Sequence, residues 1–139
     1  MKALYPALLF CFNISFGQNE IGKTYNEIKT KYKAAEYDLK EEKGVDMLEK
    51  ISINLPNANV TFIFDIWTKK CNSQIIYPKT EKDQTNLIKQ YNDTYVSKSN
   101  QLWVRYFEGY SQEIHLEYSE ISKEYYFVWR IPERVTNNQ

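Results

Sequence analysis

The sequence predicts an α+β fold, a single twisted antiparallel sheet of about 7–8 strands with two helices on one face. Two helix-start signals, at Thr24 and Thr80, each precede an amphipathic stretch. Short runs with alternating apolar and polar residues follow each stretch, and turn clusters separate those runs closely enough for hairpins. An amphipathic helix buries one stripe and a half-buried strand buries one face, so one layer of helices on one sheet satisfies both.

The first helix is expected to begin at Thr24, because Thr24-Tyr25-Asn26-Glu27 has the form of a capping box. Four apolar residues then share one helical stripe, while the intervening lysines face water. The stripe consists of Ile21, Tyr25, Ile28 and Tyr32. From Glu36 the pattern changes to short extended runs.

Four strands are expected after the first helix. Their ranges are 37–41, 47–54, 60–67 and 74–77. The first two lie around Lys43-Gly44, and the cluster from Leu55 to Asn59 is a turn that ends the second. The run from Val60 to Trp67 is apolar on both faces, which predicts a central position in the sheet.

The second helix is expected to begin at Thr80, where Thr80 to Asp83 repeats the capping signal with Asp in place of Glu. Its inward residues are Leu87, Ile88, Tyr91 and Tyr95. An edge strand is expected at 95–98. Three longer strands follow at 101–107, 112–118 and 124–131.

The two halves form a candidate tandem α-β(3-4) repeat. Asn26-Glu27-Ile28-Lys29 and Asn86-Leu87-Ile88-Lys89 occupy equivalent points of the two helices, and each half ends at a proline, Pro78 or Pro132. This order of elements resembles the helix-plus-strands duplication of beta-lactamase-inhibitor-like modules and the related small outer-membrane assembly lipoproteins. That resemblance implies a fold and no specific activity.

Residues 1–17 are expected to be a cleaved signal peptide. Lys2 is followed by a nearly continuous apolar run, and Ser15-Phe16-Gly17 places small residues before a cut at Gln18. The run is shorter than the roughly 20 residues that span a bilayer, so the mature chain is expected to have no integral membrane segment. The bulky Phe10 before Cys11 argues against lipidation. The alternative for this stretch is a buried N-terminal strand or helix.

The expected organisation is therefore a signal peptide over 1–17, a single α+β domain over 18–132 and a polar tail over 133–139. Richness in Lys, Tyr and Asn, together with Phe16-Gly17-Gln18, also resembles small secreted proteins of Bacteroidota. This resemblance implies an exported protein, periplasmic or extracellular, and no particular chemistry.

Composition excludes several functional classes. Without residues 1–17 the chain keeps 17 basic residues (18 minus Lys2) against 18 acidic ones, so no basic face for nucleic acid is expected. One remaining cysteine and one histidine cannot form an internal disulfide or a zinc motif. Cys71 is expected to be a half-buried apolar residue or a spare thiol, with an intermolecular disulfide as the alternative. No phosphate loop or nucleophile motif is present, so we expect neither metal nor cofactor.

Strand alternation predicts a candidate binding surface on the sheet face opposite the helices. Rings and arginines on a rigid sheet lose little rotamer entropy when they bind a partner, and the chain has 12 tyrosines. The candidate binding residues are Trp103, Arg105, Phe107, His115, Tyr126 and Arg130. A protein partner is expected first and a glycan second. Ordinary cross-strand pairing of these side chains is the alternative, and a shift of one residue would exchange the two faces.

Two other functions remain open at this stage. His115 alternates with Glu113 and Glu117, so it could be the general base of a hydrolase. Homodimerisation through the sheet face would give a structural role instead. Because catalysis also needs a nucleophile or metal and a concave pocket, the sequence favours a non-catalytic binding module with no catalytic residue.

Overall fold

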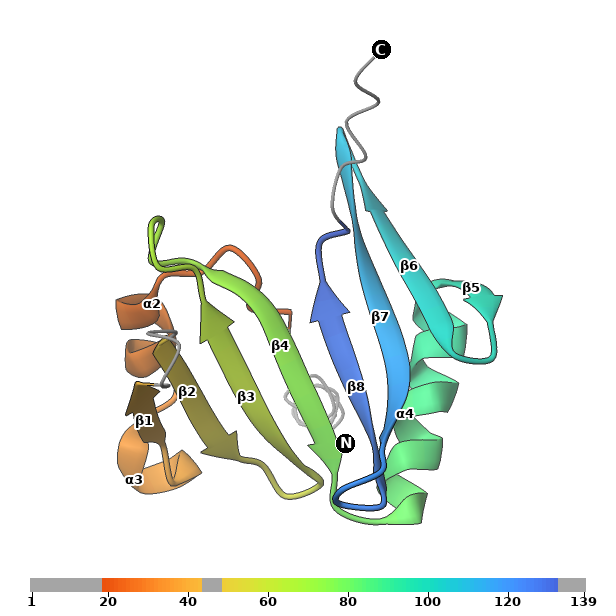
Figure 1. Ribbon diagram of the computed structural model, residues 1–139, viewed down its shortest axis with the longest axis horizontal. Helices are drawn as coiled ribbons and strands as arrows, with labels where there is room; N and C mark the ends of the chain where they lie inside the picture. Colours follow the sequence, from red (N-terminus) through yellow and green to blue (C-terminus); the bar gives the residue numbers. More distant parts are fainter. Residues whose placement is uncertain (1–18, 44–48, 133–139) are drawn as a thin grey trace, which may run out of the picture.

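The computed structural model describes residues 19–43 and 49–132 of the chain (Figure 1). Its eight strands form one antiparallel sheet in the order β1-β2-β3-β4-β8-β7-β6-β5. The first four strands are β1 (Lys40–Lys43), β2 (Glu49–Asn54), β3 (Ala58–Phe64) and β4 (Cys71–Pro78). The last four are β5 (Val96–Ser99), β6 (Leu102–Phe107), β7 (Tyr110–Ser119) and β8 (Glu124–Arg130).

The helices among the described residues are α2 (Tyr25–Lys31), α3 (Ala34–Tyr37) and α4 (Glu81–Thr94). The capping box of α2 is confirmed: Thr24 Oγ1 accepts from the amide of Glu27 at 3.2 Å, and Glu27 Oε2 accepts from the amide of Thr24 at 3.3 Å. At α4, Thr80 Oγ1 accepts from the amide of Asp83 at 3.1 Å. Both α2 and α4 are therefore capped by the threonines expected from the sequence.

Each half of the chain contributes helical structure followed by four consecutive strands. The halves meet where β4 pairs with β8, so the strand order reads outward symmetrically from the centre of the sheet (Figure 1). Tyr32, at the end of α2, contacts Phe62, and Tyr91 of α4 contacts Trp129. Phe62 and Trp129 are both paired in register with Gln74 of β4, and residues paired in register point to the same side, so both helices pack on one sheet face. The expected α+β fold, with one antiparallel sheet, is confirmed.

Two aromatic groups form the core between the helices and the sheet. Under α2, Tyr32 stacks on Phe62 with ring centroids 5.6 Å apart. Under α4, the ring of Tyr91 lies 5.2 Å from Phe127 and 5.7 Å from both Trp103 and Trp129 (centroid to centroid). Such ring pairs stabilise a core beyond the area that they bury, so the aromatic stripe of α4 fixes its position on the sheet.

Several element boundaries differ from those expected. The short helix α3 occupies the start of the strand expected at 37–41, and β1 begins only at Lys40. Strand β3 ends at Phe64 rather than at Trp67, because the Asp65 side chain accepts from two following amides and closes a turn. The start of the strand expected at 47–54, the signal at 1–17 and the tail at 133–139 lie outside the described residues.

Asn19 and Glu20 anchor the start of the described chain to the sheet. The amide of Glu20 donates to Gln74 Oε1 at 3.1 Å, and the Asn19 side chain donates to Gln112 Oε1. The Glu20 carboxylate is buried and accepts from the Tyr32 hydroxyl at 2.9 Å as well as from the Lys31 ammonium. These bonds join the chain before α2 to β4 and β7, on both sides of the centre of the sheet.

Within the described ranges, no helix combines the length and the apolar character that a membrane crossing requires.

Candidate functional site

The sheet face opposite α2 and α4, here called the open face, is identified by the alternation of β7 and β8. In β8, Phe127 and Trp129 are buried against Tyr91 of α4. Tyr126, Val128 and Arg130 therefore point to the opposite side. In β7 the residues paired with those three are Glu117, His115 and Glu113. The structure thus brings His115, Tyr126 and Arg130 of the expected site together on one face.

The other three candidate residues, all in β6, do not belong to this face. Trp103 is completely buried and donates from Nε1 to Asn92 Oδ1 of α4 at 2.7 Å. Arg105 and Phe107 alternate with Trp103, so they lie on the helix-covered side. The expectation that Trp103, Arg105 and Phe107 share the open face is therefore wrong.

The error has a physical cause in the composition of β6, where five of the six residues are apolar or aromatic and the alternation gives no direction. The one charged residue, Arg105, was expected to face water on the open side. It reaches water on the helix side instead, where its guanidinium carbon lies 4.6 Å from the centre of the Phe107 ring and its head is next to Tyr95. Leu102, Val104 and Tyr106 occupy the open face of β6.

A band of apolar and aromatic side chains crosses the centre of the open face. Val128 of β8 lies in register with Ile75 of β4 on one side and with His115 of β7 on the other. We call the band and its charged neighbours the open-face cluster. Its members are Ile75, Tyr77, Glu113, His115, Tyr126, Val128 and Arg130. All of these side chains except that of Arg130, which is exposed, are half-buried.

The polar end of the cluster is built around His115. Its Nε2 lies 2.7 Å from Glu113 Oε2 and 3.4 Å from Arg130 Nη2. A carboxylate only accepts, so the short contact requires a hydrogen on His115 Nε2, and this nitrogen then has no lone pair for Arg130. Arg130, which pairs in register with Glu113, therefore acts through its positive charge. Nδ1 of His115 is the ring nitrogen left for a ligand.

The aromatic end of the cluster is a tyrosine pair. The rings of Tyr77 and Tyr126 lie 5.7 Å apart between centroids, and the Tyr126 hydroxyl donates to Glu117 Oε2 at 3.0 Å. This hydrogen bond raises the pKa of Tyr126 above its ordinary value, and burial raises the pKa of Tyr77. Both phenols are therefore neutral at physiological pH, and they present flat ring surface of the kind enriched in interfaces.

A hollow of about 670 Å³ adjoins the polar end of the cluster. Its lining residues are Asn72, Ser73, Glu113, Arg130, Ile131 and Pro132. Arg130 and Glu113 thus face both the band and the hollow, so a bound group could contact charges of either sign beside apolar surface.

In the part of the chain that the structure describes, there is neither a metal site nor a reactive thiol. Its histidine, cysteine and acidic side chains do not form any group of three that could hold a metal ion. Cys71 is a free thiol, 2% exposed, and its Sγ donates to the Ser73 carbonyl at 3.2 Å. Burial raises the pKa of Cys71 to about 12, which keeps it protonated and unreactive at neutral pH.

Three comparisons with known proteins gave no match to this chain: none among family models, curated proteins or solved structures. Its candidate site therefore rests on the geometry of its own residues.

Sequence reasoning missed the surface roles of three residues. Ile75 and Tyr77 of β4 belong to the open-face cluster, and the pairing of β4 with β8 that brings them there is not encoded by any local pattern. The sequence predicts Trp67 at the end of a strand, whereas it lies in the turn between β3 and β4. The signal that could have located this turn is Asp65, since an aspartate after a strand commonly accepts from the amides two and three residues later.

Proposed function

We propose that this protein is an exported, non-catalytic binding module that engages a protein partner through the open-face cluster. The observation that carries the proposal is the accessible band of Ile75, Val128, Tyr77 and Tyr126 beside the charged group of Glu113 and Arg130. An apolar centre bordered by charges of both signs is the usual arrangement of a protein interface. A glycan, stacked on Tyr77 and Tyr126, is the second candidate ligand.

Export is supported by residues 1–17, which have the pattern of a signal peptide. The anchoring of Asn19 and Glu20 to β7 and β4 is compatible with cleavage just before them, because a chain that begins at Gln18 keeps both anchors. Mass spectrometry of protein recovered from its native cell is expected to give an N-terminus at or near Gln18. Intact Met1 on protein in the cytosol would contradict export.

The binding proposal is tested by affinity capture from an envelope extract, with two matched pairs of variants. Tyr126→Ala and Tyr125→Ala change neighbouring tyrosines of β8 that point to opposite faces. Arg130→Ala and Arg105→Ala make the same comparison for arginine. We expect Tyr126→Ala and Arg130→Ala each to lower capture of a specific partner at least about tenfold, as central aromatic and arginine residues of interfaces do.

The controls at Tyr125 and Arg105 are expected to capture as much partner as the unchanged protein. Equal capture by all four variants would show that the open face is not the interface. Light scattering of the purified protein separates a homodimer from a complex with another protein, because only a homodimer doubles the mass without extract.

The contact of 2.7 Å between His115 and Glu113 favours one alternative, a hydrolase in which Glu113 orients His115 as general base. His115→Ala distinguishes the two proposals. A general base predicts near-complete loss of a measured hydrolytic activity, whereas an interface predicts a partial loss of binding shared with Tyr126 and Arg130.

A further inference from the structure

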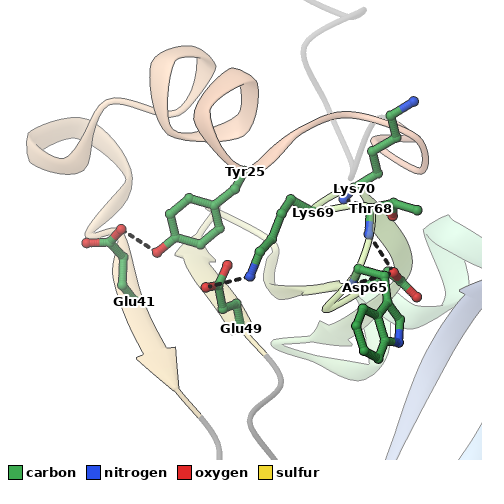
Figure 2. Close-up of polar contacts among 8 residues, drawn as sticks. Tyr25, Glu41, Glu49, Asp65, Thr68, Lys69 and Lys70 are labelled. Carbon is green, nitrogen blue, oxygen red and sulfur yellow. Dashed lines mark hydrogen bonds and ion pairs between the residues drawn. The ribbon is translucent and has the colours of Figure 1, made fainter.

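The loop between β3 and β4, residues 65–70, is a second candidate interaction site, independent of the open-face cluster. We call it the Trp67 loop. The Asp65 carboxylate closes it, because Oδ1 accepts from the amides of Trp67 at 2.9 Å and Thr68 at 2.8 Å (Figure 2). These bonds hold the pKa of Asp65 below its ordinary value, so the cap is ionised at neutral pH.

The tip of this loop carries the most exposed aromatic side chain among the described residues. Trp67 is 86% exposed and the adjacent Ile66 is 40% exposed. The other two tryptophans, Trp103 and Trp129, are buried in the core. The indole and the adjacent Ile66 side chain together form an exposed apolar tip on a closed turn, which a ligand could cover.

Five of the six backbone amides in the Trp67 loop donate to acceptors within residues 65–70. Asp65 Oδ1 takes two amides, the Lys69 amide donates to the Asp65 carbonyl at 2.9 Å, and the Asp65 amide donates to the Lys70 carbonyl at 2.9 Å. The Lys70 amide donates to Thr68 Oγ1 at 3.3 Å. A loop with these amides already bonded can enter a lipid headgroup region without leaving them unsatisfied. A protein partner that recognised the loop through backbone hydrogen bonds would find these donors occupied.

The net charge around the tip is positive, because three lysines lie near two carboxylates, those of Asp65 and Glu49. Lys69 and Lys70 follow Trp67, and Lys23 lies beside them, since its carbonyl accepts from the Cys71 amide; all three are exposed. Lys69 is held 3.4 Å from Glu49, whereas the Lys70 ammonium extends away from both Glu49 and Asp65 (Figure 2). Tryptophan at headgroup depth with lysine beside it is the usual composition of interfacial anchors.

We propose that the Trp67 loop docks on anionic phospholipid, with the indole of Trp67 among the headgroups and Lys70 against their phosphates. One such loop alone gives weak, reversible attachment rather than a stable anchor.

Tryptophan fluorescence of the full chain tests this directly, because Trp67 is the exposed tryptophan and the other two are shielded in the core. The probe is a vesicle of equal parts phosphatidylethanolamine and phosphatidylglycerol, prepared with and without brominated acyl chains. We expect a blue shift of emission and quenching by the brominated lipid, and loss of both in Trp67→Ala. Quenching reports the position of the indole itself, so attachment through another part of the chain does not imitate it.

Lysine variants test the charge requirement. Lys70→Gln should raise the lipid concentration for half-maximal quenching about fivefold, the effect of one lysine near an anionic surface. Lys123→Gln, in the exposed turn after β7 at the other end of the sheet, is the matched control and should change nothing. Absence of quenching, or equal quenching in pure phosphatidylcholine vesicles, would overturn the proposal. Loss of a protein partner in Trp67→Ala without any vesicle response would assign the loop to protein binding and overturn it as well.

Discussion

Replacing Trp103 with alanine tests which side of β6 is buried against α4. Trp103 is completely buried between α4 and the sheet, within ring contact of Tyr91 at 5.7 Å and Phe127 at 6.1 Å. Removing a buried tryptophan side chain costs about 3–5 kcal/mol, from lost burial and the cavity left behind. The lost bond to Asn92 adds little, because that exposed amide can bond to water instead.

Urea denaturation followed by far-ultraviolet circular dichroism measures this loss. With a slope of about 2 kcal/mol per molar urea, a loss of about 4 kcal/mol lowers the midpoint by about 2 M. Trp103→Phe keeps most of the ring contacts and should lower the free energy of unfolding by about 1 kcal/mol. This variant can be measured even if the alanine variant does not fold. Tyr106→Ala, on the open side of the same strand and 59% exposed, should change stability by less than about 0.5 kcal/mol. A midpoint for Trp103→Ala equal to that of Tyr106→Ala would refute the burial of Trp103 on the helix side of β6.

Three further predictions concern the buried polar groups and a helix cap. Burial raises the pKa of Cys71 to about 12, so iodoacetamide at mildly alkaline pH should label this thiol only in urea, and rapid labelling of folded protein would contradict its burial. Because this pKa lies above that of the unfolded thiol, the free energy of unfolding should fall as the pH rises past about 9. Glu20→Ala should lower the free energy of unfolding by about 2 kcal/mol, because the Tyr32 hydroxyl and the Lys31 ammonium lose a buried acceptor, whereas the exposed Glu36→Ala should lie within about 0.5 kcal/mol of the unchanged protein; equal effects would argue against the anchor. Thr80→Ala should cost about 1 kcal/mol and Thr80→Ser almost nothing, in the same denaturation assay, since the serine hydroxyl restores the cap of α4; an equal loss in both would place the effect elsewhere.

Local patterns predicted the helices well because their signals are short-range. The capping threonines, Thr24 and Thr80, bond to amides three residues later, and the stripe of α4 buries Leu87 and Tyr91 as expected. The short helix α3 escaped prediction because it has no side-chain cap and only four residues. Strand ends were less certain wherever a side chain, such as that of Asp65, closes a turn inside an apolar run.

The candidate site was predictable only in part, and the difference lies in how clearly each strand alternates. In β7, polar Glu113, His115 and Glu117 alternate with apolar Ile114 and Leu116, and the structure places the polar set on the open face. In β6 both faces are apolar, so the contacts with α4, which are long-range, decide which side Trp103 occupies. The pairing of β4 with β8 is likewise long-range, so no local pattern could add Ile75 and Tyr77 to the cluster.

Hydroxyl-radical footprinting of the protein with its captured partner tests the binding proposal most directly, because it reports each tyrosine separately. Tyr126 and Tyr77 of the open-face cluster should become protected in the complex, while Tyr125, on the opposite side of β8 and 45% exposed, should react as in the free protein. Protection of Tyr125 with unchanged reactivity at Tyr126 and Tyr77 would place the partner on the other face and contradict the account.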